Sequence, residues 1–105
     1  MVTCSLRYEI DSNQIEAFES FARTWIDLVN RMGGRHHGYF LPSEGASDIA
    51  LALFSFPSLA EYERFRGRFA GDPEIIEAQR FLKDTGCVRR VERTFFRPVL
   101  TGNSH

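Results

Sequence analysis

The stretch Ile49-Ala50-Leu51-Ala52-Leu53-Phe54-Ser55-Phe56 is apolar at seven of its eight positions. Such a run predicts a strand over 49–56 that is covered on both faces. A domain with one helix layer covers only one face of its sheet. We therefore expect a second copy of the chain over the other face, because a two-fold symmetric contact needs only one self-complementary surface.

Three more strands are expected, over 3–10, 35–41 and 88–98. The first has a core face and a polar face, because side chains of a strand alternate between its two sides. The two sets are Cys4, Leu6, Tyr8 and Ile10 on one side and Thr3, Ser5, Arg7 and Glu9 on the other. The segment 42–48 is rich in turn-forming residues and joins the second strand to the third.

A helix is predicted over 14–32, where apolar residues recur at steps of three and four. Asn13 and Glu16 have the spacing of a capping box, with Asn in place of Ser or Thr. Gly33-Gly34 ends this helix, since glycine accepts the left-handed conformation beyond a helix C-terminus.

A second helix is predicted in two pieces. Ser58 and Glu61 form a capping box at its start, and Gly71 interrupts it. Asp72-Pro73 restarts a helix that Gly86 stops. The order is then β-α-β-β-α-β, which predicts an α+β, ferredoxin-like fold: a four-stranded antiparallel sheet with the helices on one face.

Five segments of the chain resemble NIPSNAP-domain proteins. They are Leu6-Arg7-Tyr8-Glu9-Ile10, Gly38-Tyr39-Phe40, Glu44-Gly45, Phe54-Ser55-Phe56-Pro57-Ser58-Leu59-Ala60-Glu61-Tyr62 and Glu92-Arg93-Thr94-Phe95-Phe96-Arg97-Pro98. The resemblance implies one NIPSNAP-like domain over residues 1–100, followed by a flexible tail, 101–105. It also implies a homodimeric α/β-barrel, from a superfamily that includes cofactor-free monooxygenases, haem-degrading enzymes and dehydratases. It carries over no catalytic residues.

Composition argues against several classes of protein. The formal net charge is -1, without the basic surplus of most nucleic-acid binders. The strand order is shared with RNA-recognition motifs, but their Lys/Arg-Gly-Phe/Tyr signature is absent, so we expect no nucleic-acid partner. We find neither a membrane-length apolar run nor a secretion signal, and expect a cytoplasmic protein without a membrane partner. Cys4 and Cys87 should lie at opposite ends of a strand pair, reduced and unbridged.

His36 and His37 are the candidate catalytic residues. As neighbours on a strand they project to opposite faces, so we expect no metal site there and no cofactor. One should lie near the helices and the other should face the barrel, where it could bind a ligand or transfer a proton. A structural, hydrogen-bonded histidine is the alternative.

The candidate ligand-binding residues are Arg7, Glu9, Tyr39 and Arg97. Arg7 and Glu9 lie on the polar face of the first strand, where Arg90, Glu92 and Thr94 should face the same way and bind a small anionic or carbonyl-bearing ligand. Cross-strand Arg–Glu pairing is the alternative. Tyr39, with Tyr8 and Trp25, could orient a flat substrate between helix and sheet, unless Trp25 is simply part of the core.

Three functions are compatible with these residues. The first is a NIPSNAP-like protein that binds a small organic molecule in the barrel or in a helix–sheet pocket. The second is a cofactor-independent monooxygenase or isomerase, with His36 or His37 as general base and Arg7 or Arg97 stabilising an oxyanion. The third is a purely structural dimerisation module. A cavity in which a His and an Arg converge would favour binding or catalysis over a solid barrel.

Overall fold

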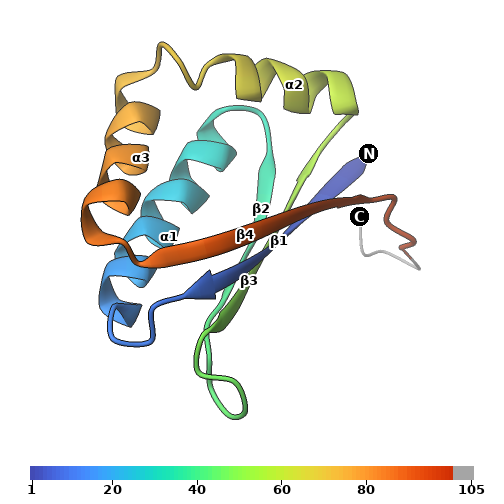
Figure 1. Cartoon of the computed structure of the whole chain (residues 1–105). Helices are drawn as coiled ribbons and strands as arrows, with labels where there is room; N and C mark the ends of the chain where they lie inside the picture. The colour runs from blue at the N-terminus through green and yellow to red at the C-terminus, as the bar shows by residue number, and fades with distance from the viewer. Residues whose placement is uncertain (101–105) are drawn as a thin grey trace.

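The computed structural model describes residues 1–100, so the tail predicted at 101–105 lies outside the described residues. Its elements follow the predicted order, with the second helix in two pieces (Figure 1). They are β1 (Val2–Ile10), α1 (Ile15–Arg31), β2 (Arg35–Phe40), β3 (Ile49–Phe56), α2 (Leu59–Gly67), α3 (Pro73–Thr85) and β4 (Val88–Phe96).

The four strands form one antiparallel sheet in the order β2-β3-β1-β4, with β2 and β4 at its edges. The helices lie on one side of this sheet, and the loop between β2 and β3 extends away from the rest of the molecule (Figure 1). The predicted ferredoxin-like fold is therefore confirmed.

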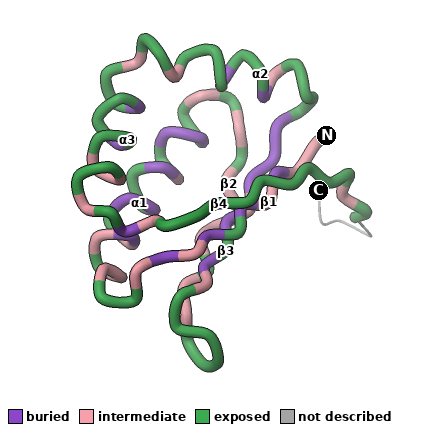
Figure 2. Tube along the Cα trace, in the orientation of Figure 1, coloured by how far each residue is buried: buried purple, intermediate pink, exposed green. Residues whose placement is uncertain are grey.

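The core lies between α1 and the two central strands. Cys4 pairs with Phe54 and Leu6 with Ala52, which places these residues on the helix side of the sheet. Buried segments run through α1, β1 and β3 (Figure 2). Trp25 is only 7% exposed and stacks on Phe21, so it belongs to this core.

The predicted capping box at the start of α1 is wrong. The helix begins one residue later, and its N-cap, Gln14, makes no side-chain capping bond. The backbone N–H of Asn13 instead donates to the carboxylate of Asp11 at 2.9 Å, closing a turn before the helix. Asx turns of this kind use the same residue types as helix caps. The spacing of Asn13 and Glu16 therefore did not suffice to predict a capping box.

The caps of α2 and α3 are confirmed. The Ser58 hydroxyl accepts from the backbone N–H of Glu61, and the Asp72 carboxylate accepts from the N–H groups of Glu74 and Ile75. Gly86 ends α3 with φ of 64°, in the left-handed region that favours glycine.

Two strands end earlier than predicted, at Phe40 and Phe96, and two irregularities interrupt the ladders. His37 is the extra residue of a bulge in β2, because His36 pairs with Phe54 and Gly38 already with Leu53. The β1–β4 register shifts between Glu9 and Ile10.

The side of the sheet away from the helices, called here the open face, is partly apolar and uncovered in the single chain. Leu51 is 42% exposed, and Phe40 and Phe96, on the two edge strands, are 52% and 54% exposed. The side chains of Ile49 and Leu53 alternate with the buried ones and share this face. Strand β3 therefore has apolar side chains on both faces, as predicted, and the cover of its open face by a second copy stays a prediction.

Cys4 and Cys87 are both buried and free, as predicted. They sit near opposite ends of the β1–β4 pair, where Cys4 lies opposite Phe95 and Val88 opposite Ile10. Among residues 1–100, no helix has the length and hydropathy that a bilayer-crossing segment requires.

Candidate binding sites on the two faces of the sheet

The predicted polar residues of the open face pair with one another. Glu9 lies 3.7 Å from Arg7 and 3.0 Å from Arg90, and Arg90 also lies 2.9 Å from Glu92. These groups are about half exposed, so each pair contributes little to stability. Their charges are nevertheless balanced within the chain. The arrangement matches the cross-strand pairing alternative, because Arg7 and Arg90 each lie beside a carboxylate of the same chain.

His36 and His37 project to opposite sides of the sheet. The Nε2 atom of His37 lies 2.8 Å from the Ser55 hydroxyl, which is 2.7 Å from the Thr3 hydroxyl. This chain of polar groups lies on the open face beside a groove of about 440 Å³, which we call the open-face groove. Arg35, Gly34 and Pro57 also line it.

His36 lies on the helix side, in a pocket of rings. Its imidazole stacks on Tyr39 at 5.0 Å between ring centroids and lies near Phe54. The backbone N–H of Gly38 donates to its Nδ1 at 2.9 Å. Burial and the neighbouring His37 lower the pKa of His36 to about 4. The imidazole is therefore neutral at pH 7 and too weakly basic for efficient proton abstraction.

The second nitrogen of His36, Nε2, is buried and has no hydrogen-bond partner among the described residues. Since Nδ1 accepts a hydrogen bond, the proton of the neutral ring is on Nε2. His36 can thus donate a hydrogen bond but is poorly suited to be a base, and the geometry favours His37 over His36 for any proton transfer.

Tyr39 lies on the helix side of the sheet, opposite Ala52. Its hydroxyl is 3.3 Å from that of Tyr8. Burial raises the pKa of Tyr8 to about 12 and that of Tyr39 well above its usual value, so both hydroxyls are protonated at pH 7. They act as a hydrogen-bonded pair inside the core.

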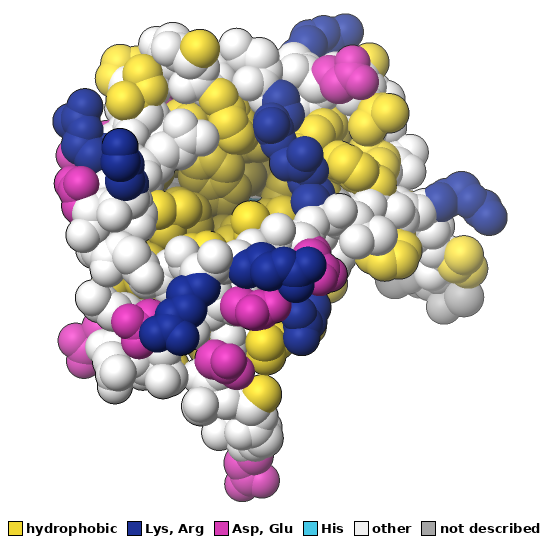
Figure 3. All heavy atoms as spheres, in the orientation of Figure 1, with side chains coloured by type: hydrophobic (Ala, Val, Ile, Leu, Met, Phe, Trp, Pro, Cys, Tyr) yellow, Lys and Arg dark blue, Asp and Glu magenta, His cyan; other side chains and the backbone are white. Residues whose placement is uncertain are grey.

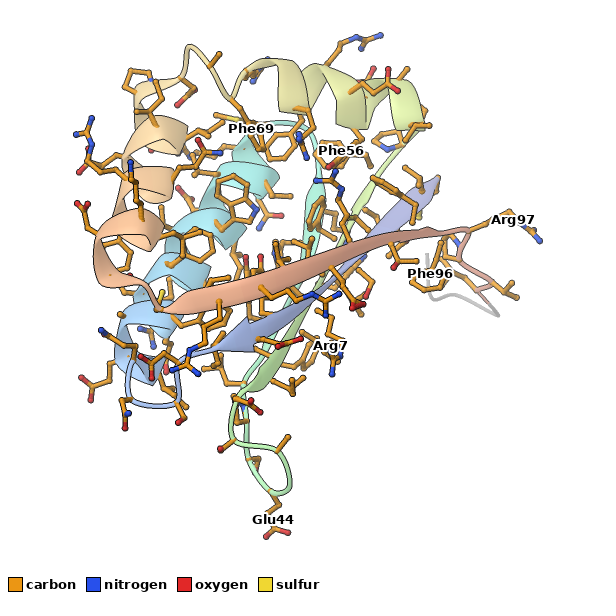
Figure 4. The ribbon with its side chains drawn as sticks, viewed as in Figure 1. Arg7, Glu44, Phe56, Phe69, Phe96 and Arg97 are labelled. Atoms are coloured by element: carbon orange, nitrogen blue, oxygen red, sulfur yellow. The ribbon has the colours of Figure 1, made fainter. Side chains whose placement is uncertain are left out.

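Arg97 follows the end of β4 and points away from the body of the molecule, whereas Arg7 projects from the open face (Figure 4). Neither meets His36 or His37 in this arrangement. The proposed combination of a histidine base with Arg7 or Arg97 is not assembled in the single chain.

The helix side contains a second concave surface. Figure 3 shows a hollow with a hydrophobic floor, bounded by α3, α2 and β4. It arises because α3 packs on α1 and α2 on β3, while β4 packs mainly on β1. We call it the helix–sheet hollow.

The register identifies the side chains that β4 presents to the hollow. Val91, Arg93 and Phe95 pair with Tyr8, Leu6 and Cys4, whose side chains face the helices. Val91 is 49% exposed, because no helix covers it. Aromatic rings of the helix layer form the opposite wall: Trp25 contacts Phe69 with ring centroids 5.6 Å apart, and Phe69 points inward from the segment between α2 and α3 (Figure 4).

Two arginines of this region are not among the site residues predicted from the sequence. Arg66 stacks over the Phe69 ring at 5.0 Å and donates to the Tyr62 hydroxyl at 3.3 Å. Arg93 lies on the helix side of β4, opposite Leu6. A charged residue at a core-facing position was the signal that could have drawn attention to it.

Two further features are a shallow pocket between two helices and the lack of a metal-binding cluster among the described residues. The pocket of about 280 Å³ lies between α1 and α3. It is lined by Thr24, Glu77 and Phe81, among others. Within residues 1–100, no group of three His, Cys, Asp or Glu side chains is arranged to hold a metal ion.

The fold, a four-stranded antiparallel sheet with its helices on one face, is shared with solved structures of NIPSNAP family proteins. The family model described as NIPSNAP matches residues 5–101, and the chain belongs to the NIPSNAP family. No curated protein matches the chain.

Solved structures share the fold at low sequence identity. A NIPSNAP family protein with unknown function from Agrobacterium tumefaciens is 19% identical, with a TM-score of 0.81 over 98% of this chain and 92% of that one. A putative antibiotic biosynthesis monooxygenase from Nitrosomonas europaea is 8% identical, with a TM-score of 0.72 over 95% and 100% of the two chains. SnoaB, a cofactor-independent oxygenase from Streptomyces nogalater, is 18% identical, with a TM-score of 0.67 over 98% and 97%. At these identities the likeness concerns the fold.

Proposed function

We propose that this protein is a homodimer that binds a small organic molecule in the helix–sheet hollow of each chain. The observation that carries the binding proposal is the uncovered helix side of β4, where Val91 and Arg93 face the helix–sheet hollow beside Phe95, whose ring contacts Tyr62 of α2. Concave, mainly apolar sites with a few polar groups are where proteins bind small molecules.

The homodimer follows from the open face. Leu51, Phe40 and Phe96 expose apolar surface on three different strands, which a monomer in water would leave wet. A second copy placed with its own open face against them buries all three at once. The paired ions of Glu9 and Arg90 would then lie at the interface already neutralised.

The names of two structural neighbours agree with a small-molecule function in general. Both carry names of oxygenases, proteins that act on organic substrates. Fold analogy raises the expectation of a small-molecule site without identifying the molecule.

Trp25 is the protein's single tryptophan and stands in the wall of the hollow, so it reports on binding there. We would screen the purified protein against metabolites by thermal shift and by Trp25 fluorescence. A true ligand should change both signals, since ligand at 100 times its dissociation constant adds ~2.7 kcal/mol to stability. Ligands that raise the melting temperature but leave Trp25 fluorescence unchanged would contradict binding in the hollow. Finding no ligand at all would favour the structural dimerisation module.

A second candidate function is that of a cofactor-independent monooxygenase or isomerase working at the open-face groove. It is favoured by the line of His37, Ser55 and Thr3 beside that groove and by Arg35 in its wall. His37 would be the base, and Arg35 would stabilise an oxyanion. If a substrate is found, His37→Ala should abolish turnover with the dimer intact, while His36→Ala should not. Turnover retained in His37→Ala would remove this candidate.

A further inference from the structure

Two positively charged side chains lie where α2 meets β4, at the edge of the helix–sheet hollow: Arg66 bonds to Tyr62, whose ring contacts Phe95, and Arg93 shares the helix side of β4 with Phe95. Arg66 comes from α2 and Arg93 from β4, and both act electrostatically on Cys4. Tyr62, whose hydroxyl accepts a hydrogen bond from Arg66, contacts Phe95 of β4 with ring centroids 4.9 Å apart. The two guanidinium groups thus belong to one small region where α2 meets β4, and Figure 3 shows basic side chains along this edge of the hollow.

These two charges are not balanced by acidic groups. Among residues 1–100, neither Arg66 nor Arg93 forms an ion pair, in contrast to Arg7, Arg89 and Arg90 on the same sheet. Cys4 does not compensate them as a thiolate, because burial raises the pKa of its thiol to about 11 despite both arginines. Two like charges in one place cost free energy unless an anion joins them.

The surroundings of the pair are apolar and aromatic. Phe69 lies beneath Arg66, Phe95 lies near Tyr62, and Trp25 continues the aromatic wall. A group that satisfies this site needs an anionic head for the guanidiniums and a flat or branched apolar body for the rings. Carboxylates suit guanidinium groups because their two oxygens match the planar fork of donors.

We infer that the ligand of the helix–sheet hollow is an apolar carboxylate, most simply an aromatic one, whose carboxylate is held between Arg66 and Arg93. This inference rests on the proposed function, because it assigns the chemical class of the ligand to the same hollow.

The experiment compares two probes that differ only in charge, 4-isopropylbenzoate and 4-isopropylbenzamide, by isothermal titration calorimetry on the full chain. The carboxylate should bind at least tenfold more tightly than the amide. Arg66→Gln and Arg93→Gln should each lower the affinity for the carboxylate at least tenfold while leaving that for the amide within threefold. Arg64→Gln is the matched control, because Arg64 lies on the same helix, pairs with Glu61 on its exposed side and changes the net charge equally. It should leave both affinities unchanged.

A separate readout distinguishes ligand recognition from structural support. Arg93→Gln removes a repulsive charge, so its melting temperature without ligand should equal or exceed that of the wild type. Equal affinities of the two probes for the wild type would overturn the inference but leave the proposed function standing, since the hollow would still bind. If neither probe binds while the fold is intact, the inference is overturned, whereas the proposed function is overturned only if the metabolite screen also finds no ligand. A change in dimer dissociation, but not in probe affinity, would place the arginines in an interface and also overturn the inference.

Discussion

His36 is a residue whose surroundings decide its chemistry. Its ring is packed between Tyr39 and Phe54, with one nitrogen bonded to the backbone of Gly38 and the other unpaired among the described residues. The sequence can predict that two neighbouring histidines of a strand face opposite ways. It could not predict the bulge at His37, which depends on how β2 meets β3, and therefore not the partners of either ring.

His36 predicts an acid-dependent loss of stability. Burial lowers its pKa from 6.5 to about 4, so on acidification the unfolded chain binds this proton first. The stabilising contribution of the neutral ring is complete above pH 6.5 and is lost as the pH falls towards 4. His36→Phe keeps the ring packing and should flatten this part of the profile, at a cost of ~1 kcal/mol for the lost bond to Gly38. Urea unfolding at several pH values measures the free energy of unfolding as a function of pH. Parallel pH profiles for wild type and variant would show that His36 is not the cause of the acid-dependent loss.

Gly34 predicts an effect of packing alone. A Cβ at this position would lie 2.7 Å from the Phe56 ring and 2.8 Å from the Val29 side chain. Gly34→Ala should therefore destabilise the fold by about 1–3 kcal/mol, as overpacking does. Gly67→Ala is its control, because a Cβ there meets nothing within 4 Å and the helix gains a better former. In chemical denaturation, the free energy of unfolding should fall in Gly34→Ala and rise in Gly67→Ala. Equal changes in the two variants would contradict the packing explanation.

At the scale of elements, helix starts were predicted with mixed success. Ser58 caps α2 and Asp72 caps α3, as their positions before the helices predicted. Pro73 favours a new helix start, because proline cannot continue a preceding helix. Asn13 has the same local pattern but is drawn into a turn with Asp11. Local spacing identifies residues able to cap, while the neighbouring turn decides which of them does.

This contrast can be measured with alanine substitutions. Asp72→Ala removes the acceptor for two N–H groups at the start of α3 and should cost ~1 kcal/mol of unfolding free energy. Asn13→Ala should change it by less than ~0.5 kcal/mol, since its side chain caps nothing. Thermal or urea unfolding of both variants decides the matter. A larger loss in Asn13→Ala than in Asp72→Ala would show that the capping assignment is reversed.

At the scale of the whole molecule, the helices cover one face of the sheet and leave the other uncovered in the single chain. The alternation in β1 and the uninterrupted apolar run of β3 were enough to predict which side chains meet the helices and which need another partner. The helix–sheet hollow could not be predicted in this way. It depends on where α3 rests, on α1 and away from β4, and no periodicity in the sequence specifies that placement.

The open face predicts the assembly state. Leu51→Glu puts a charge in the middle of the surface proposed to pair and should convert a dimer of twice 12.1 kDa into a monomer. Leu59→Glu is the control, since Leu59 is similarly exposed but lies on α2, away from this face. Sedimentation velocity at micromolar concentration separates the outcomes. A wild type that sediments as a monomer, or an unchanged dimer in Leu51→Glu, would contradict the proposed interface.

The most direct test of the account locates the bound molecule. In a titration of the ¹⁵N-labelled protein with 4-isopropylbenzoate, the largest amide and indole shifts should fall at Trp25, Phe69 and Val91, which surround the helix–sheet hollow. Shifts confined to Arg35, His37 and Ser55 would instead put the ligand in the open-face groove and contradict the account.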